Sequence, residues 1–297
     1  MAKKPDTYKY LPSAIADHLG DLQISVSKRM DSGLQGQHRS STFGSSVEFA
    51  EYREYMQGDP IERIDWNVYA RTDRYVIRRF HDEVNIRSNI LLDTSESMSF
   101  QSAGPMSKMD YSCHLAGALM YVMINQGDST SLTTFDDDLG KMYEPAATLG
   151  GLRPMLKGLE EIAPKGESNI EQALAKATEF FRGRSMVVVI SDLLQDPRQT
   201  LKGIGSLCYA GHDVTVFHVL DSDEIRLPQE GLIEVEFLET SKKMNVDIDD
   251  FRDLYLQRIR QYLDDVRIGC ANEGANYILV DTSTDLHDAL LRRTTSR

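Results

Sequence analysis

The stretch Asn89-Ile-Leu-Leu-Asp93-Thr-Ser95-Glu-Ser97 joins an apolar run to a carboxylate and two hydroxyls at alternate positions. The apolar run begins at Ile86 and has the composition of a buried strand. Side chains at alternate positions of an extended chain point the same way, so the three oxygen-bearing side chains share one side. The stretch therefore predicts a strand over 86–93 that ends in a polar turn suited to ligand binding.

Apolar runs and helical periodicity alternate along the rest of the chain. This alternation is typical of an α/β fold in which a doubly wound, mostly parallel sheet carries helices on both faces. Further strands are predicted over 129–135, 141–143, 186–191, 213–220 and 276–280, with an added hairpin over 232–244. Helices are predicted over 108–125, 151–162, 169–181, 197–210 and 249–268, with a short helix at the C-terminal end.

The chain before residue 84 has a different pattern. Residues 11–30 are amphipathic, residues 32–46 are rich in Gly and Ser and predict a loop, and residues 47–80 are dense in aromatic and charged side chains. A turn is predicted at Gly58-Asp59-Pro60 and a strand over 75–80. We therefore expect an N-terminal extension over 1–83 and an α/β domain over 84–297.

Composition excludes several classes of protein. The chain has 297 residues, of which 41% are hydrophobic and 27% charged, as in an ordinary globular protein. Its net charge of −13 argues against a nucleic-acid backbone as partner. No apolar run is long enough to span a membrane and no secretory signal is evident, so we expect a cytoplasmic protein. The three cysteines, without metal-ligand spacing, predict reduced core residues.

Two more oxygen-bearing turns are expected at the edge of the sheet where Asp93 lies. Ser168 begins a predicted helix, and Asp192 follows the apolar strand over 186–191. Ligands of open α/β sheets bind at the carboxyl ends of the strands, where the strand order reverses. Hydroxyls and carboxylates without imidazole or thiolate suit Mg²⁺ or Mn²⁺ rather than Zn²⁺. The alternative is that the serines cap the next helix and the aspartates lie in solvated loops; three such turns at one edge favour the metal site.

The pattern Asp93-x-Ser95-x-Ser97, with Ser168 and Asp192, resembles the metal-ion-dependent adhesion site of von Willebrand factor A domains. The resemblance covers about residues 84–295. It implies that Ser95 and Ser97 ligate the cation directly and that Asp93 does so through water. Ser168 stands where the family usually has threonine, and Asp192 is followed by Leu-Leu rather than the frequent glycine.

The N-terminal segment is similar to the signature of a bacterial subfamily catalogued as a domain of unknown function. The resemblance rests on a run of aromatic and charged residues that includes Arg53, Asp59, Arg63, Asp65, Trp66 and Arg71. It implies association with a MoxR-type AAA+ ATPase, as an adaptor in the maturation or assembly of a client protein. These residues are expected either to form a charge-paired, stacked cover on the sheet or to bind a partner.

Two classes of function follow. The first is a non-enzymatic binding module, without catalytic residues, whose Mg²⁺ or Mn²⁺ captures a carboxylate of the ATPase or its client. The second is a metal-dependent phosphohydrolase, because a carboxylate at the end of the first strand also begins several phosphatase sites. Against the second, the residue two positions after Asp93 is Ser95 rather than a second aspartate. No phosphate-binding loop and no Gly-x-Ser-x-Gly motif is present.

Overall fold

The computed structural model describes residues 8–11, 48–59, 61–81, 86–102, 104–181, 183–229, 231–237, 242–286 and 288–290. The chain separates into two compact units: residues 30–85 form the small unit, and residues 1–29 with 86–297 form the α/β unit. The division predicted between residues 83 and 84 stays a prediction. Residues 12–30 of the expected amphipathic segment over 11–30, and all of the expected loop over 32–46, lie outside the described residues.

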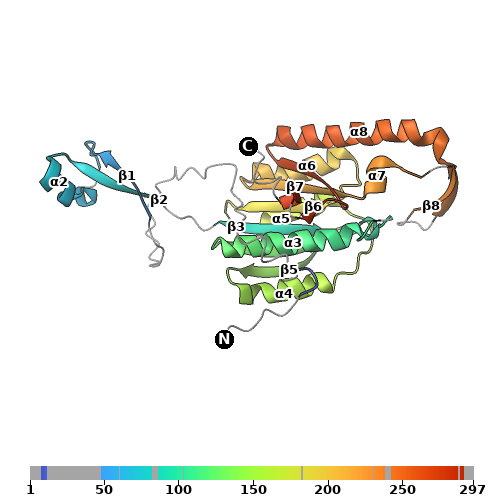
Figure 1. The fold of residues 1–297 in the computed structure, drawn as a ribbon, viewed down its shortest axis with the longest axis horizontal. Helices are drawn as coiled ribbons and strands as arrows, with labels where there is room; N and C mark the ends of the chain where they lie inside the picture. Colours follow the sequence, from blue (N-terminus) through green and yellow to red (C-terminus); the bar gives the residue numbers. More distant parts are fainter. Residues whose placement is uncertain are drawn as a thin grey trace. The chain divides into compact units, whose positions relative to one another are not determined.

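A six-stranded sheet forms the centre of the α/β unit (Figure 1). Its strand order is β10-β7-β6-β3-β4-β5; every neighbouring pair is parallel except β4 and β5. The strands are β3 (Arg87–Asp93), β4 (Ser129–Phe135), β5 (Leu139–Ala146), β6 (Met186–Ser191), β7 (Asp213–Leu220) and β10 (Asn276–Asp281). The predicted α/β class with a doubly wound, mostly parallel sheet is confirmed.

The chain reverses its direction across the sheet between β3 and β6. From β3 it proceeds to β4 and β5 on one side, and it then returns to β6, β7 and β10 on the other. Residue Leu92 of β3 pairs with Ile190 of β6, so the two strands end side by side. The carboxyl ends of β3 and β6 therefore form the topological switch point, where open α/β sheets bind their ligands.

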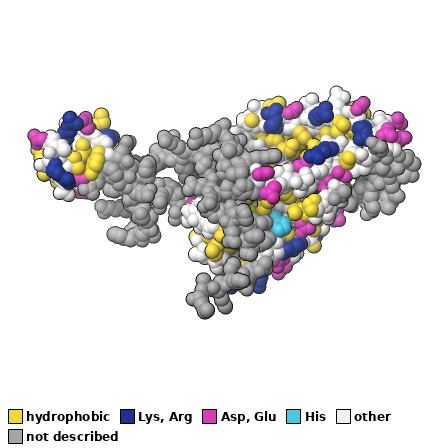
Figure 2. Space-filling model, viewed as in Figure 1, with side chains coloured by type: hydrophobic (Ala, Val, Ile, Leu, Met, Phe, Trp, Pro, Cys, Tyr) yellow, Lys and Arg dark blue, Asp and Glu magenta, His cyan; other side chains and the backbone are white. Residues whose placement is uncertain are grey.

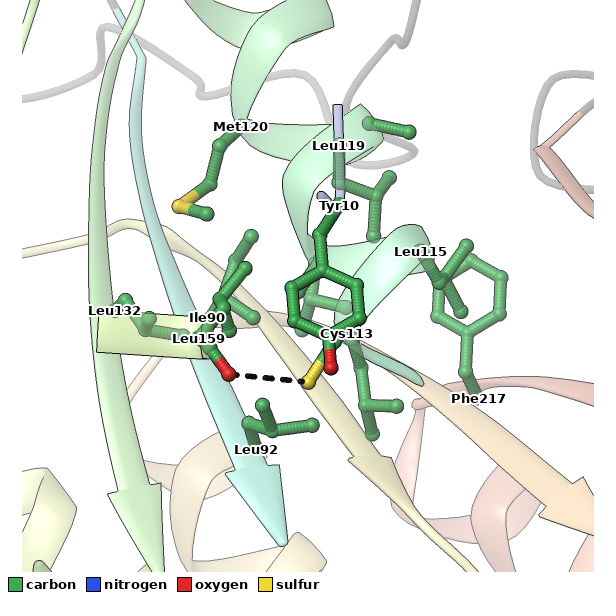
Figure 3. Close-up of a cluster of buried hydrophobic side chains, with 14 of the residues drawn as sticks. Tyr10, Ile90, Leu92, Cys113, Leu115, Leu119, Met120, Leu132, Leu159 and Phe217 are labelled. Carbon is green, nitrogen blue, oxygen red and sulfur yellow. Dashed lines mark hydrogen bonds between the residues drawn. The ribbon is translucent and has the colours of Figure 1, made fainter. Parts of the chain in front are cut away.

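Helices cover both faces of the sheet and bury two hydrophobic clusters. One cluster lies under α3 and α4 and includes Ile90, Leu119 and Phe217, all almost fully buried (Figure 3). The other lies under α5, α6 and α8 and includes Leu91 and Val266. The helices are α3 (Lys108–Asn125), α4 (Leu149–Glu160), α5 (Ile170–Phe180), α6 (Pro197–Tyr209), α7 (Ser222–Arg226) and α8 (Ile248–Glu273), and η2 (Glu96–Ser99) is a 3₁₀ turn.

Residues Tyr8–Leu11 pack on helix α3, which is distant from them in the sequence. Tyr10 is only 6% exposed, its hydroxyl donates to Asp110 at 2.7 Å, and its ring meets His114 edge to face. A Cβ at Gly117 would lie 2.7 Å from the backbone carbonyl oxygen of Tyr10, so the close approach requires glycine there. Burial of Tyr10 thus ties this segment to the α/β unit.

Tyr10→Ala is expected to lower the free energy of unfolding by about 2 kcal/mol, because the substitution removes a buried ring from the core. The loss stays below that of a central core residue because the short segment detaches as a whole once its ring is gone. Tyr209→Ala is the matched control: Tyr209 is 96% exposed, and its change is expected to stay within about 0.5 kcal/mol. Urea denaturation of both variants measures this, and equal losses would contradict the packing of Tyr10.

The small unit is an antiparallel pair of strands with a short helix. Strand β1 (Glu48–Glu54) pairs with β2 (Val76–His81), and the 3₁₀ turn η1 (Ile61–Arg63) and α2 (Trp66–Thr72) connect them. Asp65 caps α2 by accepting from the backbone of Asn67 and Val68 at 3.0 and 3.2 Å. Strand β2 begins one residue later and ends one residue later than the strand predicted over 75–80.

The predicted hairpin is present as β8 (Leu232–Phe237) paired antiparallel with β9 (Lys242–Asp247). It extends three residues beyond the predicted end at Met244. Positively and negatively charged side chains are interspersed over the visible face of the α/β unit (Figure 2). Within the described part of the chain, every helix is too short or too polar to cross a lipid bilayer.

Candidate functional site at the switch point

Asp93 ends strand β3 at the switch point and is 1% exposed. Its Oδ1 accepts the backbone N–H of Ser95 at 2.9 Å, which folds the chain back directly after the strand. Ser95 is also fully buried, and its hydroxyl lies 3.2 Å from that of Ser97. The structure thus brings the three side chains of the Asp-x-Ser-x-Ser pattern together, although through the turn after Asp93 and η2 rather than through an extended chain with alternating side chains.

Two further hydroxyls, from other segments of the chain, donate to the remaining oxygen of Asp93. Ser168 Oγ, directly before α5, lies 3.3 Å from Asp93 Oδ2, and Ser191 Oγ, at the end of β6, lies 2.6 Å from the same atom. Backbone bonds hold the loop before Ser168 in place: Glu96 N donates to Gly166 O and Lys165 N donates to Thr94 O. Residues from three separate segments of the chain therefore surround one buried carboxylate.

The electrostatics of Asp93 leave its charge uncompensated. Burial raises the pKa of this carboxyl, the nearby carboxylate of Asp192 raises it further, and the result is a pKa of about 6. Among the described residues, no Lys, Arg or His forms an ion pair with Asp93. A buried carboxylate that has only hydroxyl and amide donors is the kind of group that a cation stabilises.

Asp192 lies at the same edge but has different partners. Its Oδ2 accepts from Nζ of Lys108 at 2.8 Å, and its backbone carbonyl lies 2.8 Å from Nε2 of His218. Lys108 also donates to Glu224 Oε1 of α7 at 2.8 Å. The structure therefore brings Asp192 close enough to Asp93 to raise the pKa of that carboxyl, while directing the Asp192 carboxylate to a lysine. Sequence reasoning missed Lys108, Glu224 and His218.

The residue after Asp192 has an unusual backbone. Leu193 has φ of 51°, in the left-handed region, although its side chain is 1% exposed and belongs to the core under α5, α6 and α8. Its backbone N–H donates to Ser191 Oγ at 2.9 Å, and its carbonyl accepts from the hydroxyl of Tyr262 on α8. Side-chain burial and two hydrogen bonds thus hold the loop in a conformation that leucine disfavours.

The donor set at Asp93 fits a hard divalent cation. One carboxylate and the hydroxyls of Ser95, Ser97 and Ser168 are oxygen ligands of the type that Mg²⁺ and Mn²⁺ accept. The described residues contain no cluster of three or more His, Cys, Asp or Glu side chains arranged for a metal. A cation here would accordingly rest on hydroxyls and a single carboxylate, and it would retain water in its remaining positions.

An open groove of about 540 Å³ adjoins the site at Ser168. Carboxylates of Asp137, Glu167 and Glu171 line it, together with amide side chains of α5 and of the Gln195 loop. Gln195 Oε1 accepts the backbone N–H of Ile170 at 3.2 Å, which joins the groove wall to the start of α5. The surface beside the site is therefore polar and carries negative charge.

The predicted signature residues form contacts within the small unit. Arg53 donates to both carboxylate oxygens of Asp59 at 2.7 Å, and Asp65 accepts from the hydroxyl of Tyr52 at 3.2 Å besides capping α2. Trp66 is 54% exposed and meets Tyr69 edge to face. Arg71 donates to the backbone of Asn67 in its own helix, and the side chain of Arg63 lies outside the described residues. A role of these residues in partner binding stays a prediction.

Comparison with known proteins identifies the family. The family model described as "Protein of unknown function DUF58" matches residues 51–263, which include the small unit from Glu51 and most of the α/β unit. The chain belongs to the DUF58 family. The DUF58 match spans the signature segment and all five residues of the predicted metal site.

Curated relatives of this DUF58 chain have no assigned function. It is 26% identical over 290 residues to an uncharacterized protein of Mycobacterium tuberculosis strain H37Rv, covering 95% of this chain and 90% of the relative. An uncharacterized protein of Mycobacterium bovis matches with the same identity and coverage.

Solved structures similar to the DUF58 chain include three proteins of low sequence identity. An aerotolerance-related membrane protein from Bacteroides fragilis is 20% identical with a TM-score of 0.48, covering 72% of this chain and 100% of its own. BatB from Bacteroides thetaiotaomicron is 16% identical with a TM-score of 0.45, covering 71% and 96%. The VWA domain of SpRpn10 is 12% identical with a TM-score of 0.41, covering 71% and 96%.

Proposed function

We propose that this DUF58 protein is a non-enzymatic binding module that captures a carboxylate of a partner protein through Mg²⁺ or Mn²⁺. The observation that supports the proposal is the uncompensated, buried carboxylate of Asp93 among the hydroxyls of Ser95, Ser97 and Ser168. A divalent cation at this position would supply an electrophilic ligand site for an Asp or Glu side chain.

Each residue of such a site has a distinct role. Ser95 and Ser97 are proposed to hold the cation directly, and Ser168 and Asp93 to fix its position. Ser191 Oγ donates to Asp93 Oδ2, which keeps the carboxylate oriented toward the other hydroxyls. The acidic groove beside Ser168 favours a partner whose carboxylate is flanked by basic or amide side chains.

The partner is proposed to be a MoxR-type AAA+ ATPase or its client, with the protein in the cytoplasm. This part of the proposal rests on the resemblance of the signature segment to that of a subfamily associated with such ATPases. The exposed side chains of Tyr52, Met56 and Trp66 in the small unit offer a second contact surface for such a partner.

The test measures binding between the purified protein and a MoxR-type ATPase encoded by the same organism. Because the ATPase itself requires Mg²⁺ with its nucleotide, a chelator alone does not isolate the cation of this site. Ser95→Ala/Ser97→Ala is therefore compared with wild type in excess Mg²⁺, and its affinity for the partner is expected to fall at least about tenfold. Ser99→Ala is the matched control, since Ser99 is an exposed serine of the same 3₁₀ turn.

Two outcomes would contradict the proposal. Equal partner affinity of the wild type and the double serine variant would make the cation irrelevant to this contact and shift attention to the small unit. Turnover of a generic phosphate ester with Mg²⁺ that disappears in Asp93→Asn would support a phosphohydrolase instead.

A further inference from the structure

Lys108 is the first residue of α3, and its side chain is completely buried. Its ammonium group lies 2.8 Å from Oδ2 of Asp192 and 2.8 Å from Oε1 of Glu224, whose side chains are 2% and 18% exposed. Burial opposes the charge of Lys108, but the two carboxylates outweigh it, so its pKa is raised. The lysine is therefore a permanent positive charge inside the protein, next to the proposed cation site.

The two aspartates at the switch point are compensated unequally. Both carboxylate oxygens of Asp192 are used, since Oδ2 accepts from Lys108 and Oδ1 accepts the backbone N–H of Leu194 at 3.4 Å. Within the described part of the chain, Asp93 accepts only from hydroxyls and one backbone amide. A cation at the site thus meets one carboxylate that has only hydroxyl and amide partners among the described residues, while the second is already paired with an internal cation.

We infer that Lys108 is an internal counter-ion that holds the Asp192 carboxylate away from a bound divalent cation and thereby sets the cation affinity of the site low. The inference rests on the proposed function. Its physical basis is that Lys108 repels a second positive charge nearby and occupies an oxygen that the cation would otherwise attract. In an interior of low effective dielectric, both effects are larger than at the surface.

This arrangement makes cation binding depend on the partner. The negative charge of Asp192 is paired with Lys108 and is not available to the cation. A carboxylate from a partner supplies a negative charge in its place. The cation then binds more tightly with the partner than without it, and by linkage the partner binds more tightly with the cation. Lys108 is in this sense a positioning residue: it acts through Asp192 and is not itself a ligand.

The test measures the Mg²⁺ and Mn²⁺ affinity of the full chain by calorimetric titration. Lys108→Met removes the charge and the donor, and we expect it to bind both cations about tenfold more tightly than wild type. Lys108→Gln keeps a donor for the two carboxylates, and we expect it to show the same direction of change if Lys108→Met does not fold. Lys176→Met removes an exposed lysine and is expected to leave the affinity unchanged.

A second substitution identifies Asp192 as the intermediary. In Lys108→Met/Asp192→Asn, the carboxylate released by loss of the lysine is absent, and the gain in affinity is expected to disappear. A merely structural lysine would give another result, because its loss would weaken both folding and cation binding. The inference requires Lys108→Met to lower the folding stability and to raise the cation affinity.

The outcomes separate this inference from the proposed function. If wild type binds Mg²⁺ better than Ser95→Ala/Ser97→Ala does, but neither Lys108 variant binds it more tightly than wild type, the counter-ion role is overturned and the cation site stands. If wild type binds Mg²⁺ no better than the double serine variant, the proposed cation site fails, and this inference fails with it.

Discussion

Lys108→Met is expected to lower the free energy of unfolding by about 3–5 kcal/mol in the absence of divalent cations. The substitution leaves Asp192 and Glu224 without their shared cationic partner, and the Asp192 side chain is only 2% exposed, so solvent stabilises its charge little. Removal of one member of a buried ion cluster costs more than the cluster contributes, because the remaining charge stays desolvated. Chemical denaturation in chelator measures the loss.

Two comparisons test the reason for this loss. Lys176→Met breaks an ion pair with Asp138 in which both side chains are more than 40% exposed, and it is expected to cost less than about 1 kcal/mol. Lys108→Met combined with Asp192→Asn and Glu224→Gln removes every charge of the cluster and is expected to recover most of the stability. A loss below about 1 kcal/mol in Lys108→Met alone would show that the buried charges are stabilised by other groups.

Asp93→Asn is expected to reduce the affinity for Mg²⁺ or Mn²⁺ by about a hundredfold. The substitution keeps the shape of the side chain but removes the carboxylate charge around which the hydroxyls gather. The same variant is expected to lose less than about 1 kcal/mol of stability in chelator, since the charge it removes has no ionic partner among the described residues. The hydroxyls of Ser168 and Ser191 can turn to accept from the new amide group.

The matched control for Asp93→Asn is Asp137→Asn. Asp137 is an exposed carboxylate that lines the neighbouring groove, and its removal tests the general effect of lost negative charge. Its cation affinity is expected to stay within about twofold of wild type because solvent and salt screen the charge. Titration of both variants under the same conditions gives the comparison; equal weakening in both would contradict a specific role of Asp93.

The sequence predicted the central elements of the fold closely because their patterns are strong. Strands β4, β6 and β7 and helix α3 have the bounds that the apolar runs and the helical spacing indicate. Fully buried parallel strands read as continuous apolar runs, as in Met186–Ser191, and they leave little ambiguity. The strand order still required the structure, since no local pattern shows which strands are neighbours.

Strand β5 and helix α8 were both longer than predicted, for physical reasons. Strand β5 spans Leu139–Ala146 rather than 141–143, and it contains Gly140 and Pro145, which disfavour a strand in the sequence. An edge strand tolerates proline because one side of its backbone needs no partner. Helix α8 spans Ile248–Glu273 rather than 249–268; its last turns include polar residues that obscured the apolar spacing, and Gly274 ends it.

The sequence predicted which loops meet at the site, but not how their charges are paired. Asp93, Ser95 and Ser97 are grouped by their closeness in one stretch, although the chain there turns instead of continuing as a strand, and Ser168 is grouped with them by its position before a helix. Lys108 gave no signal, because a lysine in the first turn of a helix is usually solvated. Its burial depends on α3 beginning beside the ends of β6 and α7, and that is a property of the topology alone.

The left-handed backbone of Leu193 limits how this loop can change during evolution. Glycine adopts that conformation without strain and would recover about 1 kcal/mol, whereas loss of the buried leucine side chain would cost about 2 kcal/mol. Single replacement by glycine is therefore unfavourable, even though the backbone geometry alone would prefer it. Glycine would also widen the range of conformations open to the loop. A lineage that keeps leucine here keeps a stiff loop after β6, and the cost of losing that side chain protects this rigidity from gradual sequence drift.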